Sequence, residues 1–228
     1  LVGGGSNPKP GEISLAHNGI LFLDELPEYK RQVLEVMRQP LEDRVVTISR
    51  AKMSVDYPAG FMLVASMNPS PSGNFYDPND PKSDPEYVVK RYMNRISGPL
   101  MDRIDLHIEV PAVPFEQLSC IEKGESSSTI RKRVVQTRKA QQERFTVIPE
   151  IHYNAQLHPK LIEKFCKIDT ICTEMLKQAM DKLNLSARSY SRILKVSRTI
   201  ADMEGAESIL PRHLAEAIQF RSLDRGMG

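Results

Sequence analysis

Two short apolar segments in the first third of the chain are each followed by polar residues, a pattern typical of parallel strands. The first, Ile20–Leu23, runs into Asp24 and Glu25, and the second, at residues 61–66, is followed by Asn68. Four consecutive apolar residues predict a strand buried on both faces, as in a parallel sheet covered by helices. Ligands of such sheets bind beyond the carboxyl ends of the strands, so these polar residues are candidate site residues.

The two adjacent carboxylates after the first strand suit a site that hydrolyses a nucleotide. Asp24 is placed to hold the water shell of a magnesium ion, and Glu25 to polarise an attacking water. The same residues also fit a buried strand that runs into an acidic helix cap, because Pro27 and Glu28 are typical of a first helical turn. Asn68 can orient water without adding charge, although Asn-Pro is also ordinary turn chemistry.

In the segment between these strands, the spacing of the apolar residues changes from helical to alternating. Residues 27–39 have helical spacing, and Pro40 is expected to end that helix. Residues 46–57 alternate with a period of two, which predicts a hairpin whose tip carries Arg50 and Lys52. Two cations at such a tip could follow a nucleic-acid backbone, and a solvated hairpin end explains the same pattern equally well.

The pattern changes again towards the second half of the chain. The proline-rich residues 70–86 predict an irregular surface loop, and the apolar residues 106–110 predict one more strand. After the serines at 126–128, helices are expected at 129–144, 171–183, 193–201 and from Pro211 onward. The chain is therefore expected to fold as an α/β domain at residues 1–113, followed by a linker and an all-α domain at 114–228.

The helix expected at 129–144 is strongly basic. Its cations are Arg131, Lys132, Arg133, Arg138, Lys139 and Arg144. Such a run is usually a solvated face, but it is also compatible with contact to nucleic acid. The pattern by itself favours the first interpretation.

Composition fits an enzyme of the cytoplasm. The chain has 228 residues and a net charge of +2, so no global attraction to polyanions follows. Its three cysteines, Cys120, Cys166 and Cys172, have no paired spacing and predict neither a disulfide framework nor a zinc site. No apolar run approaches about 18 residues and no signal-peptide pattern occurs, so we expect neither membrane insertion nor secretion.

Three motifs resemble those of a known family. They are PGEISLAHNG at residues 10–19, LDELPE at 23–28 and ISGPLMDRID at 96–105. Together with the order of a strand ending in Asp-Glu, a helix, a hairpin and a strand ending in Asn, they resemble the magnesium-chelatase-like AAA+ ATPases of the ComM/YifB type. The resemblance covers essentially the whole chain. It implies a partial AAA+ P-loop NTPase core at residues 1–113 and a helical lid in the rest.

The resemblance assigns roles to several residues. It implies that Asp24 and Glu25 end the Walker B strand, with Asp24 holding magnesium through water and Glu25 as the catalytic base. Asn68 is implied to be the first sensor. Arg103 is implied to be an arginine finger that reaches the nucleotide of a neighbouring subunit, whereas a surface salt bridge is the simpler explanation.

One further arginine is singled out in the helical domain. Ser186 is a good helix cap, which puts Arg188 in a first turn where the helix dipole disfavours a cation and a bound anion would reverse that penalty. By resemblance Arg188 is the second sensor, which contacts the terminal phosphate of the nucleotide. Arg192, one turn later, is the second candidate for this role. The alternative is an exposed arginine without a partner.

One motif of the family is absent. The phosphate-binding loop G-x-x-x-x-G-K-[ST] occurs nowhere in the chain, and residues 3–6 lack its lysine. We therefore expect a piece of a longer protein, in which tight binding of ATP and Mg²⁺ needs the absent segment and the isolated piece does not hydrolyse ATP. In the AAA+ fold the missing strand lies between residues 61–66 and 105–109, so an open sheet edge is expected.

The loop at residues 70–86 departs from the family. Many relatives have paired cysteines there that resemble a zinc knuckle, whereas this chain has Ser70 and Ser72. Serine hydroxyls are poor zinc ligands, so we expect no zinc at this loop.

The resemblance also implies partners. The full-length protein is expected to assemble into a ring, with a hexamer favoured, and to hydrolyse ATP between subunits. The hairpin is implied to project Arg50 and Lys52 into the pore, as in related ring helicases. The leading interpretation is a DNA motor for unwinding or branch migration in competence or recombination. The alternatives are a chelatase-type ATPase that remodels a protein partner during metal insertion, and an inactive assembly module.

Overall fold

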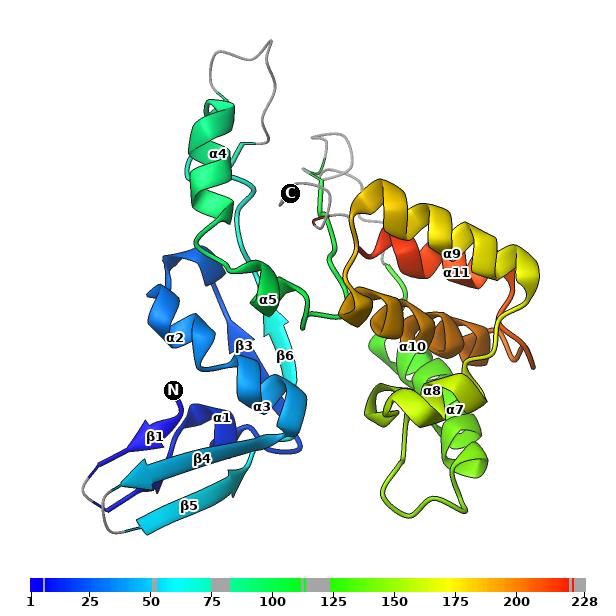
Figure 1. The fold of residues 1–228 in the computed structure, drawn as a ribbon, viewed down its shortest axis with the longest axis horizontal. Coiled ribbons are helices and arrows are strands. Elements are labelled where there is room, and N and C mark those ends of the chain that lie inside the picture. The colour runs from blue at the N-terminus through cyan, green and yellow to red at the C-terminus, as the bar shows by residue number, and fades with distance from the viewer. Residues whose placement is uncertain are drawn as a thin grey trace. The chain divides into compact units, whose positions relative to one another are not determined.

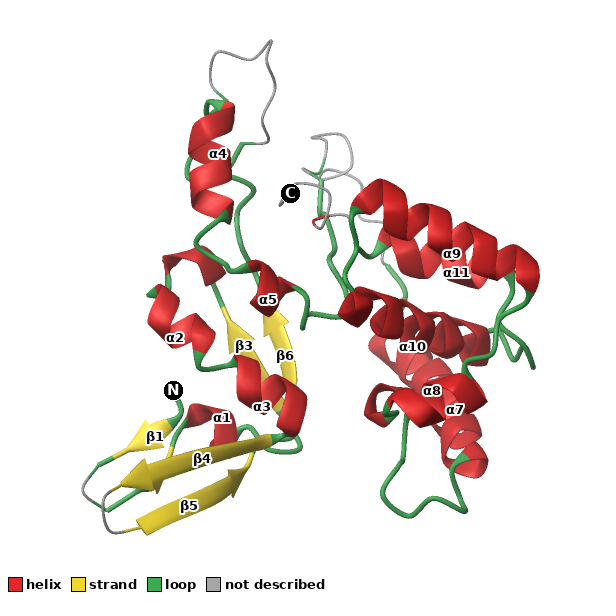
Figure 2. Cartoon of the chain, in the orientation of Figure 1, coloured by secondary structure: helices red, strands yellow, loops and turns green. Residues whose placement is uncertain are grey.

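The computed structural model describes residues 1–5, 7–50, 53–74, 83–111, 113, 124–221 and 223. The chain forms two compact units, Leu1–Ile104 and Asp105–Gly226 (Figure 1). The first unit holds all the described strands, and the described elements of the second are helical (Figure 2). The fold is therefore an α/β unit followed by an all-α unit, as the sequence predicts.

The first unit contains a short parallel sheet. β3, Ile20–Leu23, pairs residue by residue with β6, Met62–Ala65. Both predicted strands are confirmed, but the prediction of burial on both faces is wrong. Leu21 is buried, whereas Ile20 and Phe22 are 64% and 58% exposed. Successive side chains of a strand point to opposite faces, and only one face of β3 is packed within the described residues.

Two short helices follow β3 where the pattern predicts one. A 3-10 turn, Leu26–Glu28, leads into α2, Arg31–Glu35, and then α3, Arg38–Asp43. Pro40 lies in the first turn of α3, so the prediction that it ends a helix is wrong. The first turn of a helix has no intrahelical partners for its N–H groups, and a proline there loses no hydrogen bond.

The predicted antiparallel hairpin is confirmed. It consists of β4, Val45–Arg50, and β5, Met53–Pro58. Val46 and Ile48 are buried on one face, and the hydroxyl of Tyr57 donates a 2.7 Å hydrogen bond to a backbone carbonyl of the N-terminal segment. That segment contributes three short elements: β1 (Gly3–Gly4), β2 (Lys9–Pro10) and α1 (Glu12–Leu15).

The first unit ends in two helices that the sequence analysis does not predict. α4, Glu86–Met93, follows the proline-rich loop, and α5, Gly98–Met101, is capped by Ser97, whose hydroxyl accepts a 3.3 Å hydrogen bond from the backbone of Leu100. Residues 106–110, in the second unit, form no strand, because they have no ladder partner among the described residues. The strand predicted there is wrong.

The second unit is the predicted bundle of helices. They are α7 (Ser127–Arg144), α8 (Pro159–Phe165), α9 (Thr170–Leu183), α10 (Ala187–Met203) and α11 (Pro211–Gln219), with a 3-10 turn at Asn154–Gln156. Cys166 and Cys172 lie in its apolar core. Burial raises the pKa of both thiols to about 11, so they stay protonated at neutral pH. Among the described helices, none has the length and apolar character that a membrane crossing requires.

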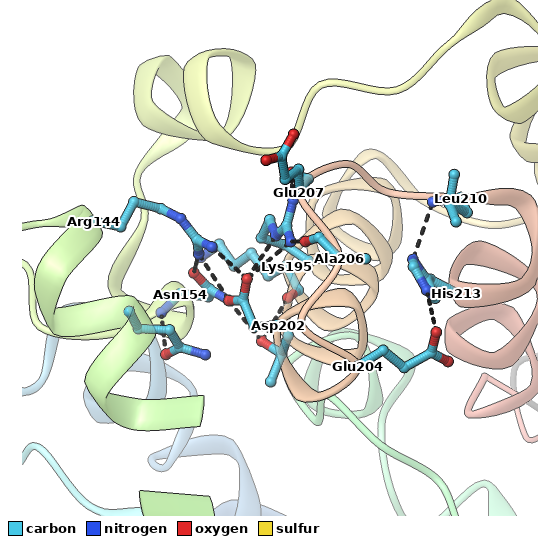
Figure 3. A network of polar contacts seen from close by, with 12 residues as sticks. Arg144, Asn154, Lys195, Asp202, Glu204, Ala206, Glu207, Leu210 and His213 are labelled. Carbon is cyan, nitrogen blue, oxygen red and sulfur yellow. Dashed lines mark hydrogen bonds and ion pairs between the residues drawn. The ribbon is translucent and has the colours of Figure 1, made fainter. Parts of the chain in front are cut away.

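A buried polar network joins α7, the 3-10 turn and α10 (Figure 3). The carboxylate of Asp202 accepts hydrogen bonds from Arg144 (2.8 Å), Asn154 (2.8 Å) and Arg198 (3.0 Å). Burial by itself would raise the pKa of Asp202, but the hydrogen bonds from Arg144 and Asn154 and the charge of Arg198 lower it below the usual 3.8. Asp202 is therefore ionised at neutral pH and holds three elements together.

Replacement of this carboxylate is expected to destabilise the helical unit. Asp202→Asn should lower the free energy of unfolding by about 3 kcal/mol, because two arginines would lose their buried counter-charge. Because the pKa of Asp202 is lower in the folded state, its contribution is present above about pH 4 and is lost as the pH falls through the folded pKa. Urea unfolding followed by circular dichroism at about pH 7 and about pH 3 measures this, and the difference from wild type should shrink at the lower pH.

The matched control for this prediction is Glu174→Gln, an exposed carboxylate on α9. Its effect is expected to stay within about 0.5 kcal/mol. An Asp202→Asn protein as stable as wild type at neutral pH would contradict the role assigned to the network.

Candidate functional site

The candidate site lies at the carboxyl ends of β3 and β6. Asp24 and Glu25 follow β3 directly and are exposed. The carboxylate of Asp24 accepts hydrogen bonds from the backbone N–H of Glu25 at 3.0 Å and from the hydroxyl of Ser66. The backbone N–H of Leu26 donates to the carbonyl of Ser66 at 2.9 Å. The turn that carries both carboxylates is thus fixed to the end of the neighbouring strand, through a serine that the sequence analysis does not single out.

The backbone of Glu25 adopts an unusual conformation. Its φ of 51° and ψ of 50° lie in the left-handed helical region, which costs a non-glycine residue about 1 kcal/mol or more. This turn ends the strand and leaves the Glu25 carboxylate exposed at the sheet edge. Because strained backbone is concentrated at functional sites, the conformation supports a functional role for Glu25.

Asn68 lies just beyond β6 and is exposed. The hydroxyl of Tyr92, on α4, is hydrogen-bonded to the backbone of Asn68. Tyr92 is only 5% exposed. Burial raises the pKa of its hydroxyl, and the negative charge of Glu28 raises it further. A neutral tyrosine therefore supports the turn of the candidate sensor at every pH near neutrality.

Arg95 connects the same helix region to the turn after β3. Its guanidinium donates to the carboxylate of Glu28 at 2.7 Å and to the carbonyl of Pro27 at 3.3 Å, and lies 5.7 Å from the ring centre of Tyr92. Tyr92 and Arg95 thus hold the turns that follow both strands. The sequence pattern missed them, and the only local signal is their spacing of three residues, which places them on one side of a helical turn.

The side chain of Arg103 is largely buried within the first unit. Its side chain is 8% exposed and forms an ion pair with Glu42 of α3, while its guanidinium also donates to the carbonyl of Pro99 at 2.7 Å. The Nε of Arg103 is buried without a hydrogen-bond partner among the described residues. The salt-bridge alternative is thus observed, with the Arg103 side chain largely buried and Glu42 exposed. The role of arginine finger stays a prediction.

The structure places the two sensor candidates of α10 differently. Ser186 caps the helix as predicted, and its hydroxyl accepts a 3.2 Å hydrogen bond from the backbone of Ser189. Arg188 is exposed in the first turn. Arg192 is engaged in an ion pair with Asp105 and is 19% exposed. The role of second sensor stays a prediction for Arg188, with Arg192 as the second candidate.

The hairpin cations lie at the edge of the described structure. Arg50 is exposed and donates to the carbonyl of Gly5 at 3.3 Å and to that of Ser49 at 3.2 Å. Lys52 lies outside the described residues. Its predicted role in nucleic-acid binding stays a prediction, as does that of Arg50.

The ends of the proline-rich loop are held together by hydrogen bonds. The hydroxyls of Ser70 and Ser72 lie 3.1 Å apart, and the carboxylate of Asp84 accepts from the backbone of Ser72 at 2.8 Å. Ser70 is fully buried. Within the described ranges, no three His, Cys, Asp or Glu side chains are grouped so that they could hold a metal ion.

Two family models together match most of the chain. Residues 1–118 match magnesium chelatase, subunit ChlI, and residues 124–221 match magnesium chelatase, subunit ChlI C-terminal. The chain therefore belongs to the magnesium-chelatase-like AAA+ family.

Individual proteins are similar in sequence to this chain. Over 226 residues the chain is 50% identical to the competence protein ComM of Haemophilus influenzae and 45% identical to YifB of Escherichia coli. Each alignment covers 99% of this chain and 43% of the relative. The chain is also 23% identical over 216 residues to the magnesium-chelatase subunit ChlI of Mesostigma viride, covering 92% of this chain and 51% of that protein. The chain thus spans less than half the length of ComM and YifB.

Proposed function

We propose that the full-length protein hydrolyses ATP and uses the reaction to act on DNA. The observation that carries the ATPase part is the pair Asp24 and Glu25 at the end of β3, with Asn68 just beyond the adjacent parallel strand β6. The similarity to a protein named for competence supports DNA as the substrate. Because the chain spans 43% of that relative, the activity is proposed for the longer protein, and the isolated chain is expected not to hydrolyse ATP.

The residues at this sheet edge fit a magnesium–nucleotide complex. Mg²⁺ prefers carboxylate and water oxygens, and the exposed carboxylate of Asp24, oriented by Ser66, offers such a ligand. When bound, the ion supplies positive charge against the phosphates. Glu25 would accept the proton of the attacking water, and Asn68 would orient that water. Tyr92 would be a positioning residue, because it contacts the backbone of Asn68 and not the nucleotide.

Two arginines are proposed to complete the site in an assembled ring, for which we favour a hexamer. Arg188, at the start of α10, would contact the terminal phosphate, because the N-terminal turn of a helix favours a bound anion. Arg103 would reach the nucleotide of the neighbouring subunit. Since Arg103 is paired with Glu42 in this structure, that role requires the ion pair to open.

DNA is proposed to contact the hairpin of β4 and β5. Arg50 is exposed near its tip and Lys52 is at the tip in sequence. Cations at this place would bind phosphates of a strand passing through the ring. The alternative occupant of the pore, a protein partner remodelled as in metal insertion, is favoured only by the family models.

The experiment that tests this proposal is the steady-state ATPase rate of the full-length protein, with and without branched or single-stranded DNA. We expect DNA to raise the rate, and the stimulation to fall steeply between about 50 mM and about 200 mM salt, because phosphate contacts release counterions. If the ATPase rate is the same with and without DNA at both salt concentrations, the DNA proposal is wrong and remodelling of a protein partner becomes the proposed function. A full-length protein that neither binds nor hydrolyses ATP would overturn the ATPase proposal itself.

A further inference from the structure

The first half of α7 is exposed along its whole length. Residues 127–136 are all exposed, and the buried positions of the helix are Thr137 and Gln141, in its second half. The helix therefore contacts the bundle mainly through its C-terminal turns. Arg144, its last residue, is fixed there by Asp202.

The exposed surface of α7 carries a row of cations, which we call the basic stripe: Arg131, Lys132, Arg138 and Lys139. Seven residues are close to two helical turns, so the two pairs lie on one face, about 10 Å apart along the axis. At 3.6 residues per turn, this face points about 140° away from the buried positions Thr137 and Gln141. The stripe is thus directed to solvent.

The cations of α7 outside the stripe form ion pairs with carboxylates of the unit, and the described residues show a different environment for the stripe. Arg133 forms a bidentate ion pair with Glu125, with N···O distances of 2.8 and 3.0 Å. Arg144 is paired with Asp202. In the described part of the chain, no carboxylate forms an ion pair with any member of the stripe. The guanidinium of Arg138 instead stacks on Tyr153, 4.2 Å from the ring centre. Positive charge is therefore concentrated on one face of a chain whose net charge is only +2.

We propose that the basic stripe of α7 binds the phosphate backbone of nucleic acid, as a contact separate from the pore hairpin. Regularly spaced cations on an exposed helix, without an ion pair among the described residues, match the charges of a phosphate backbone, and binding releases condensed counterions. An acidic protein partner fits less well, because lysine is depleted in protein interfaces and the stripe includes little apolar surface beyond Val135. This inference shares with the proposed function the assignment of DNA as partner, but it does not depend on ATP hydrolysis.

The test is the salt dependence of DNA binding by the full-length protein without nucleotide, measured by fluorescence anisotropy of a labelled single-stranded oligonucleotide. The stripe variant is Lys132→Gln/Lys139→Gln. The slope of log K against log salt is expected to become shallower by about 0.7 for each lost contact, or about 1.4 in total. The matched control is Glu125→Gln/Arg133→Gln, which removes an ion pair between Arg133 of the same helix and Glu125 just before it, and should keep the wild-type slope.

Three outcomes decide the inference. A stripe variant with the wild-type slope and affinity, and unchanged circular dichroism, overturns it. Stripe-dependent binding of polyglutamate as strong as that of DNA at the same salt would assign the surface to an acidic protein instead, and likewise overturns it. A wild type that fails to hydrolyse ATP but shows the stripe-dependent slope would support this inference and contradict the proposed ATPase.

Discussion

Glu25→Gln in the full-length protein is expected to lower kcat for ATP hydrolysis by about 10² to 10⁴-fold, because a glutamine of nearly the same size cannot accept the proton of the attacking water. The affinity for ATP should stay close to that of wild type, since Asp24 and the rest of the turn are unchanged. Phosphate release measures the first quantity, and binding of a fluorescent ATP analogue the second.

A matched control exists in the same unit. Glu12→Gln removes an exposed carboxylate at the start of α1 and is expected to hydrolyse ATP as wild type does. If Glu25→Gln instead turns over at the wild-type rate, Glu25 is not the base. If it loses ATP binding along with turnover, its effect lies in the structure of the turn.

Arg103→Ala is expected to lower turnover of the assembled protein by about 10³-fold or more, as the loss of an arginine finger does. The observed ion pair calls for a control, because removal of Arg103 also breaks its ion pair with Glu42. Glu42 is 46% exposed, so the loss of this one ion pair should cost at most about 1 kcal/mol of stability. Glu42→Gln breaks the same ion pair but keeps the guanidinium, and should therefore retain turnover.

Mixing the two inactive variants separates a finger from a structural arginine. In a ring, each site would combine Glu25 of one subunit with Arg103 of the next, so a mixed ring of Glu25→Gln and Arg103→Ala subunits contains some complete sites. An equal mixture should regain activity in about a quarter of its head-to-tail interfaces. Mixed rings that stay as inactive as their parents would show that Arg103 acts within its own subunit, through its contact with Glu42.

Local pattern was sufficient to predict β3, β6 and the hairpin of the first unit. The four apolar residues of β3 and the period of two in β4 and β5 are signals within a few neighbouring residues, and the strand ends then place Asp24 and Asn68 on adjacent strands. Ser186 was predicted as a cap for the same reason, because a cap depends on a single turn. The helical bundle followed from apolar positions repeated along long helices.

The features that the sequence did not reveal depend on distant or missing neighbours. Residues 106–110 have strand composition, but a strand also needs a ladder partner. A proline ends a helix where another residue in its place would donate a backbone hydrogen bond, and the pattern cannot show whether that holds at position 40. Tyr92 and Arg95 act through contacts with residues more than twenty positions away, so their spacing predicts nothing about what they hold. The pairing of Arg103 with Glu42 is of the same kind.

The left-handed backbone of Glu25 has a consequence for protein engineering. Asparagine and glycine adopt this conformation more readily than glutamate does, so either residue at position 25 should make the turn easier to form. A search for thermostable variants of this protein would therefore tend to select the loss of its proposed catalytic base. Stability and activity are opposed at this position, and a screen for one of them should keep residue 25 fixed.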